Sequence, residues 1–186
     1  MSTLLSVDAE LRGEADRLLD SGLRDLLETF GEVHLTGSYT LELMTWRDLD
    51  IHIVRESLDR VSFFELGGRI ADLLEPHRMH FRDETIGETP GLPRGLYWGV
   101  YAAAWKIDVW ASSREDFEPV KRFCDRIGER LTPETREAIL AIKSAVCQHP
   151  EYRRGFTSAD IYKAVLDRGM RRPEEFQLHY RLCPRA

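Results

Sequence analysis

A pair of aspartates inside an apolar run restricts how this chain can fold more than any other feature. Asp48 and Asp50 begin the segment DLDIHIV, in which polar and apolar residues alternate. Side chains of a β-strand point alternately to its two faces, so the pattern predicts a strand over 48–54 with both aspartates on one face. The residues expected in the core are Leu49, Ile51 and Ile53. Two adjacent carboxylates repel each other and need a cation to neutralise them.

A Gly-Ser pair, Gly37 and Ser38, precedes this acidic doublet by a gap of nine residues. A turn of this kind offers backbone N–H groups and a hydroxyl, which suit phosphate oxygens. The turn and the doublet together indicate a site for a metal-bound nucleoside triphosphate.

A third acid follows in the segment AWKIDVWAS. If Ile107 and Val109 face the core, Lys106 and Asp108 lie on the opposite face of that strand. Asp108 completes a triad if this strand lies beside the strand of the doublet. Nucleotidyl transfer with two magnesium ions commonly uses three carboxylates, and Mg²⁺ prefers oxygen ligands that it shares with substrate phosphates.

Composition narrows the class of protein. The 186 residues suffice for one domain with a core, or for a compact domain with a helical extension. The net charge of −6 argues against a long nucleic acid as partner and favours a cationic acceptor. No apolar run approaches the roughly 20 residues of a membrane helix, and the N-terminus lacks the features of a signal peptide. Three widely spaced cysteines fit neither a disulfide framework nor a zinc site, so we expect a cytoplasmic protein without membrane contact.

Hydrophobic periodicity and turn residues predict an α/β chain. Helices are expected over 6–30, 61–75, 113–130, 133–148, 158–169 and 173–182, and strands over 33–36, 48–54, 79–81, 96–101 and 105–110. Ser112 with Glu115 fits a capping box for the helix near 113. The paired Gly67 and Gly68 weaken the helix over 61–75 unless close packing against the sheet requires them. We expect a core over 1–112 and a C-terminal helical segment over 113–186.

The ordered set of Gly37-Ser38, Asp48-Leu49-Asp50 and the later Asp108 resembles the nucleotidyltransferase superfamily of the DNA polymerase β type, over about residues 30–111. The small size, with helices after the core, is similar to the minimal and antibiotic-modifying branches. The resemblance implies a mixed, largely antiparallel sheet flanked by helices, with a C-terminal helical segment.

The implied activity is metal-dependent transfer of a nucleoside monophosphate from a triphosphate such as ATP to a hydroxyl of a small molecule or protein, with release of pyrophosphate. The resemblance also implies two Mg²⁺ ions on the three aspartates, with Mn²⁺ able to substitute, and the β- and γ-phosphates at Gly37 and Ser38. The acceptor is not identified by the sequence. A homodimer is possible by analogy with related small enzymes.

The chain departs from the family pattern at two places. Arg47 precedes the first acid where many members have a small residue, and Tyr39-Thr40 follow the Gly-Ser turn where many have a basic one. The cation that contacts the phosphates is then Arg47, Lys106 or Arg55. Arg can hold phosphate through two hydrogen bonds, but an ion pair of Arg47 with Glu42 is the alternative.

Other interpretations stay open. The two aspartates and His52 could be the solvent face of an edge strand, with Ser38 as a helix N-cap. His52 could touch substrate or be structural. The aromatic residues Trp46, Tyr97, Trp98 and Trp110 could stack on a ligand or pack in the core. The chain could also be an antitoxin that binds a partner toxin, or a nucleotide-binding module without catalysis.

Overall fold

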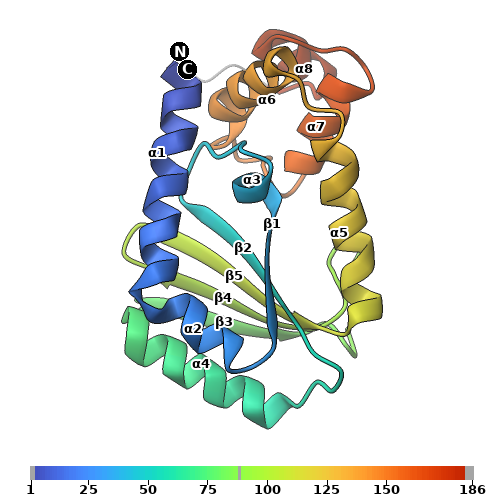
Figure 1. Ribbon diagram of the computed structural model, residues 1–186. Coiled ribbons are helices and arrows are strands. Elements are labelled where there is room, and N and C mark those ends of the chain that lie inside the picture. The colour runs from blue at the N-terminus through green and yellow to red at the C-terminus, as the bar shows by residue number, and fades with distance from the viewer. Residues whose placement is uncertain (1–2, 88, 183–186) are drawn as a thin grey trace.

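A five-stranded β-sheet forms the centre of the computed structural model, which describes residues 3–87 and 89–182. The strands are β1 (Glu32–Thr36), β2 (Asp48–Val54), β3 (Arg78–Asp83), β4 (Leu96–Ala102) and β5 (Trp105–Ser112). Their order across the sheet is β1-β2-β5-β4-β3 (Figure 1). β2 and β5 run parallel, whereas the other three neighbouring pairs are antiparallel. The prediction of a mixed, largely antiparallel sheet is confirmed.

Helices from the first half of the chain cover one face of the sheet (Figure 1). They are α1 (Thr3–Leu18), the π-helical turn η1 (Leu19–Leu23), α2 (Arg24–Glu28) and α4 (Arg60–Leu74). Leu49, Ile51 and Ile53 of β2 are fully buried beneath them, as the alternating pattern predicts. The opposite face of β2 is therefore the one that carries the aspartates.

The prediction of one continuous helix over 6–30 is wrong. Gly22 has φ of 104°, which interrupts the helical backbone between α1 and α2. Glycine adopts positive φ without the steric penalty that a Cβ atom causes. The break lets the chain change direction while Leu19 and Leu23 stay fully buried.

Close packing accounts for one of the two glycines in α4. A Cβ atom at Gly67 would lie 2.6 Å from Cε2 of Trp98, whereas a Cβ atom at Gly68 would meet nothing within 4 Å. Trp98 also donates a hydrogen bond from Nε1 to the Phe63 carbonyl, at 3.0 Å. Gly67 therefore allows the backbone of α4 to approach the sheet at this ring.

Helix α5 (Arg114–Gly128) packs against β1, β2 and β5 on the face that carries the aspartates. Its residue Phe117 contacts His52, with ring centroids 5.2 Å apart. The N-cap of α5 is Ser113, whose side chain accepts a hydrogen bond from the Asp116 N–H at 3.1 Å. The capping box predicted at Ser112 is wrong, because Ser112 is fully buried at the end of β5 and donates to the Arg94 carbonyl.

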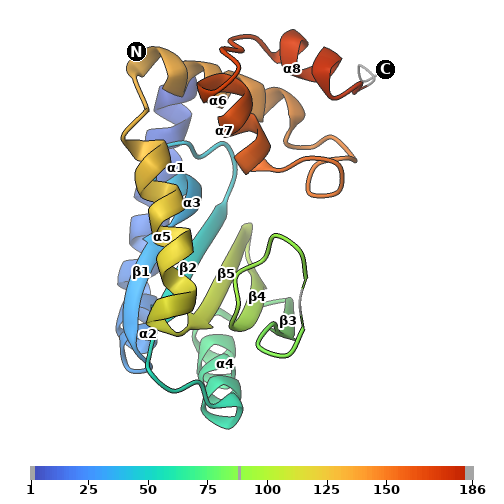
Figure 2. The ribbon, with the colours of Figure 1, turned by 90° about the vertical axis from the view of Figure 1, so that its right-hand side faces the viewer.

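The remaining helices pack into a second hydrophobic cluster beside the start of β2 (Figure 2). They are α6 (Pro133–Val146), α7 (Ser158–Leu166) and α8 (Pro173–His179). Leu41 and Leu43, from the connector between α3 (Gly37–Thr40) and β2, join this cluster. The helical segment is therefore anchored to the connector that leads into β2, while the division at residue 112 stays a prediction. Within the described part of the chain, no helix has the length and apolar character needed to span a membrane.

Candidate active site

The sheet register brings the three predicted acids together. Asp50 lies directly opposite Asp108 in the parallel pairing of β2 with β5, and Asp48 lies opposite Lys106. Side chains at paired positions of neighbouring strands point to the same face. The expectation that the strand of Asp108 lies beside the strand of the doublet is therefore confirmed. Three carboxylates share one face at the centre of the sheet.

Two cations bind these carboxylates. The Lys106 ammonium donates to Asp48 Oδ1 at 3.2 Å and also to Asp108 Oδ2. Arg153 donates from Nη2 to the other oxygen of Asp48, at 2.6 Å. The Tyr97 hydroxyl donates to Asp108 Oδ1 at 2.7 Å. Each hydrogen bond fixes the direction of a carboxylate that the sequence singles out.

The electrostatics differ among the three acids. Burial raises the pKa of Asp50 to about 7, and repulsion by Asp48 and Asp108 adds to this effect. Burial also opposes ionisation of Asp48, but Lys106 and Arg153 outweigh it and lower the pKa of that carboxyl. Asp48 is thus an ionised carboxylate at neutral pH, whereas Asp50 gains and loses its proton near neutrality.

The Gly-Ser turn lies against this cluster. Gly37 has φ of 65°, in the left-handed region that favours glycine. A Cβ atom at this position would collide with Asp50 Oδ2. The short helix α3, which contains Ser38, therefore begins in contact with the second acid of the doublet.

The donor set fits a magnesium site, although its present arrangement does not form one. Among the described residues, no group of three His, Cys, Asp or Glu side chains is arranged to hold a metal ion. Carboxylate oxygens are nevertheless the ligands that Mg²⁺ prefers. The Lys106 ammonium, which bridges Asp48 and Asp108, supplies the positive charge that the cluster needs. Lys106 and Arg153 contact carboxylate oxygens that a divalent ion would use.

A cleft of about 830 Å³ opens over the carboxylates. One wall is the sheet, with Asp48, Asp50 and Asp108, and the other comes from the segment 152–163 before and within α7. Trp46 packs edge-on against Tyr152, which lines the cleft, with ring centroids 5.2 Å apart. The cleft lies between the sheet and the C-terminal helical segment, so both parts of the chain contribute to it.

Two charged residues near the site are not predicted from the sequence. Arg153 has φ of 68° in the loop between α6 and α7, and no motif in the sequence connects it to Asp48. Lys143 is almost fully buried in α6, and its ammonium donates to the Leu43 carbonyl at 2.6 Å. Burial lowers the pKa of Lys143 to about 8. From the other side, Asp8 accepts a hydrogen bond from the Met44 N–H at 2.7 Å. The connector between α3 and β2 is thus held by buried charged groups of α1 and α6.

The ion pair of Arg47 with Glu42, one of the two alternatives for Arg47, does not form. Arg47 forms two hydrogen bonds with Glu14 of α1, at 2.5 and 2.9 Å. Glu42 instead pairs with Arg12 and Arg136. Arg47 is exposed and does not line the cleft over the carboxylates. The third candidate cation, Arg55, lies over the ring of Phe30, at 4.2 Å from its centroid.

His52 shares the strand face of the aspartates but lies under α5. It is buried between Trp110 and Phe117, and burial lowers its pKa to about 4. The structure therefore gives His52 a packing role as a neutral ring. Among the aromatic candidates, Trp98 packs in the core, whereas Tyr97 and Trp110 line the cleft.

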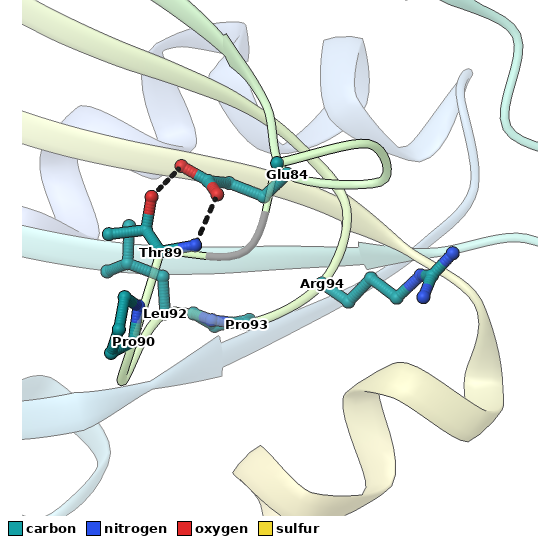
Figure 3. Close-up of a pocket in the computed structure, with 7 residues that line it drawn as sticks. Glu84, Thr89, Pro90, Leu92, Pro93 and Arg94 are labelled. Carbon is teal, nitrogen blue, oxygen red and sulfur yellow. Dashed lines mark hydrogen bonds between the residues drawn. The ribbon is translucent and has the colours of Figure 1, made fainter.

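A smaller pocket of about 320 Å³ lies in the loop between β3 and β4 (Figure 3). Its acidic residue, Glu84, accepts hydrogen bonds from the Thr89 hydroxyl at 3.0 Å and from the Thr89 N–H at 3.3 Å. The carboxylate therefore closes the loop on itself, and we assign no chemistry to this pocket.

Comparisons with solved structures identify the fold. No family model and no curated protein matches the sequence. The polymerase core of TRAMP, an RNA surveillance complex, superposes with a TM-score of 0.60 at 16% identity, over 82% of this chain and 48% of that one. The RNA terminal uridylyl transferase Cid1 gives 0.58 at 16% identity, over 83% and 48%. A cytoplasmic RNA terminal U-transferase gives 0.55 at 14% identity, over 88% and 52%.

The chain spans about half the length of these proteins. Identities this low establish the fold and no finer relationship. The five-stranded mixed sheet, its flanking helices and the C-terminal helices together have the fold of a nucleotidyltransferase catalytic core of the DNA polymerase β type.

Proposed function

We propose that this chain transfers a nucleoside monophosphate from a magnesium-bound nucleoside triphosphate to a hydroxyl of a small-molecule or protein acceptor, releasing pyrophosphate. The observation that carries the proposal is the in-register pairing of Asp50 with Asp108, with Gly37 in contact with Asp50. The fold supports it as well, since a solved poly(U) polymerase of similar fold holds magnesium and a triphosphate analogue, 3′-dATP.

Asp48, Asp50 and Asp108 would hold two Mg²⁺ ions, for which Mn²⁺ can substitute. The ions would supply charge neutralisation at the phosphates and lower the pKa of the acceptor hydroxyl. Most of the catalysis in phosphoryl-type transfer is positioning and charge stabilisation, so the protein has little covalent work to do.

The other residues of the site have separate roles in this proposal. Gly37 and Ser38 bind the β- and γ-phosphates through N–H groups and the serine hydroxyl. Asp108 accepts the proton of the acceptor hydroxyl, and the Tyr97 hydroxyl holds that carboxylate in place. Lys106 and Arg153, released from the aspartates, contact the phosphates as their negative charge moves onto the leaving group.

Arg47 is not needed as a phosphate ligand in this scheme. Its guanidinium is occupied by Glu14, whereas Lys106 and Arg153 both line the cleft. We therefore assign contact with the phosphates to Lys106 and Arg153.

A nucleotide-binding module without transfer is the second candidate, and one observation favours it. Lys106 and Arg153 already neutralise Asp48. If both cations stay on Asp48 when a triphosphate binds at Gly37 and Ser38, the triphosphate is bound but Asp48 does not ligate a metal ion.

Pyrophosphate release separates the two candidates. The full chain is incubated with Mg²⁺ and each of the four nucleoside triphosphates, with water alone and with a panel of hydroxyl acceptors. We expect magnesium-dependent release of pyrophosphate that Asp108→Asn abolishes and Asp72→Asn, an exposed control on α4, leaves unchanged. Triphosphate binding by a folded protein that releases no pyrophosphate under any of these conditions overturns the transfer and supports the binding module.

A further inference from the structure

Basic and aromatic residues continue the active face of the sheet to its edge. We call this surface the basic–aromatic strip; it consists of Arg78, His80 and Arg82 on β3 with Tyr97 and Tyr101 on β4. The three β3 residues alternate, so they share one face of the strand. The register places Arg78 opposite Tyr101 and Arg82 opposite Tyr97. The strip is thus one continuous surface.

The strip joins the carboxylate cluster directly. Asp50, Asp108, Gly99 and His80 occupy matching positions on four neighbouring strands. Gly99 leaves room at this point, because a Cβ atom there would collide with the His80 ring. His80, Arg82, Tyr97 and Tyr101 line the same cleft as the three aspartates. A molecule on the strip therefore lies next to Asp108.

The cations of the strip stack on its rings. The Arg78 guanidinium lies 3.7 Å from the ring centroid of Tyr101, and that of Arg82 lies 5.5 Å from the ring centroid of Tyr97. Both arginines are exposed. The nearby acid Asp83 pairs with Arg60 instead, at 2.5 Å. Among the described ion pairs, none involves Arg78 or Arg82, so their charge is available to an anion.

The geometry of the reaction indicates which substrate contacts the basic–aromatic strip. In an in-line displacement, the attacking hydroxyl and the leaving pyrophosphate lie on opposite sides of the reacting phosphorus. The proposed function puts the pyrophosphate portion at Gly37 and Ser38, which follow β1. In the sheet order, β4 and β3 lie on the other side of the aspartates. An acceptor therefore approaches over the basic–aromatic strip.

We propose that the basic–aromatic strip is the acceptor subsite and that it binds an acceptor with a planar ring and a phosphate, that is, a nucleotide unit. The half-buried ring of Tyr101 lines the cleft and presents aromatic surface to a base, while the buried Tyr97 supports the strip from below. The arginines can hold a phosphate through two hydrogen bonds. The assignment as acceptor rests on the proposed function. The strip is positively charged, whereas the whole chain has a net charge of −6. The net charge by itself favours a cationic acceptor, but the local charge of the strip favours an anionic one.

A nucleotide unit has two sources, a free nucleoside monophosphate or the end of a single-stranded oligonucleotide. The test measures fluorescence anisotropy of a labelled single-stranded hexanucleotide titrated with the full chain, and then its displacement by nucleoside monophosphates. If nucleoside monophosphates displace the probe at concentrations similar to those of the unlabelled hexanucleotide, a free nucleotide is sufficient for binding to the strip. Displacement by the hexanucleotide alone identifies the oligonucleotide end.

The variants are Arg78→Gln and Arg82→Gln, both at exposed positions, with Arg126→Gln on the exposed surface of α5 as the matched control. We expect each strip variant to weaken binding roughly tenfold and to reduce the slope of log K against log salt by about 0.7, the value for one phosphate contact on a single strand. Tyr101→Ala should weaken binding without changing that slope. The control should behave as wild type.

Binding of a non-hydrolysable triphosphate with Mg²⁺, measured by calorimetry on the same variants, separates this inference from the proposed function. We expect it to be unchanged in Arg78→Gln, because Arg78 is not among the residues that line the cleft over the aspartates. A wild-type chain that binds the triphosphate but neither nucleotide probe, or binds the probes equally well in the strip variants, overturns the subsite. Probe binding that needs the strip, without any triphosphate binding, supports the strip and overturns the proposed function.

Discussion

Arg153 and Asp48 are 105 residues apart in the sequence, and Nη2 of the arginine lies 2.6 Å from Oδ2 of the aspartate. The contact joins the loop between α6 and α7 to the first carboxylate of the sheet. It also places a guanidinium where a divalent ion would need that oxygen. The C-terminal helical segment is therefore coupled to the state of the candidate metal site.

Arg153→Gln should tighten the binding of manganese alone, because the guanidinium no longer competes for Asp48. Arg153 is partly exposed, so the ion pair is worth at most about 1 kcal/mol and the gain in affinity is roughly fivefold. Titration of Mn²⁺ followed by electron paramagnetic resonance measures it. Arg154→Gln, one residue away and exposed, is the control. Unchanged or weaker Mn²⁺ binding in Arg153→Gln contradicts the competition.

Asp50 should make the stability of the metal-free protein fall as the pH rises. Its pKa is about 7 in the folded chain against 3.8 in the unfolded one, so between these values the folded state holds a proton that the unfolded state has released. The stabilising effect of that proton is lost as the pH passes through 7. Asp50→Asn cannot ionise, and we expect it to melt above wild type at pH 8 by at least about 2–4 °C, which corresponds to ~1 kcal/mol.

The melting curves are recorded in chelator from pH 4.5 to pH 8. The difference between Asp50→Asn and wild type should shrink towards the acid end, where both side chains are neutral. A difference that is constant over this range would show that Asp50 does not titrate near neutrality.

Gly67 and Gly68 should respond in opposite directions to substitution by alanine. At Gly67 the added methyl group meets the Trp98 ring, and overpacking of this kind costs about 1–3 kcal/mol. At Gly68 the methyl group enters open space in a helix, where alanine is favoured by ~0.5–1 kcal/mol. The free energy of unfolding in urea measures both. Equal effects at the two positions would disprove the close approach of α4 to the sheet.

Gly37→Ala should damage the site more than the fold. The left-handed φ costs a non-glycine residue about 1–2 kcal/mol, and the new methyl group displaces the Asp50 carboxylate. We expect a modest loss of stability together with loss of magnesium-dependent triphosphate binding. Gly13→Ala, in α1 with only Arg17 nearby, is the control. Normal triphosphate binding by Gly37→Ala would contradict the proposal that the Gly-Ser turn and the acidic cluster form one triphosphate site.

Local patterns in the sequence predict much of this fold. The alternation around Asp48 and Asp50 predicts β2 and its two faces, and the same reasoning places Lys106 and Asp108 on one face of β5. The helix start predicted at residue 133 is equally local, and α6 begins at Pro133. These features depend on residues close in sequence, so the pattern contains the information.

The remaining features depend on contacts between distant segments. The break at Gly22 depends on how α1 and α2 meet the sheet. Ser112 and Ser113 both have an acid three residues later, and only the burial of Ser112 in β5 makes Ser113 the N-cap. The sequence leaves Arg47 open as a phosphate ligand or as an ion-pair partner of Glu42, but α1 brings Glu14 to it instead. Arg153 and Lys143 reach the site from the helical segment, and their sequence context resembles that of many surface residues. Their roles follow from three-dimensional packing alone.

The central claim is that three aspartates of adjacent strands bind metal-bound triphosphate. Calorimetry with a non-hydrolysable triphosphate, with and without Mg²⁺, tests it most directly on wild type, Asp48→Asn, Asp50→Asn and the control Asp72→Asn. We expect wild type and the control to bind at least tenfold more tightly with Mg²⁺, a difference of about 1.4 kcal/mol, and both site variants to lose this dependence. Magnesium dependence that is absent from wild type, or that survives in folded Asp48→Asn and Asp50→Asn, would contradict the claim.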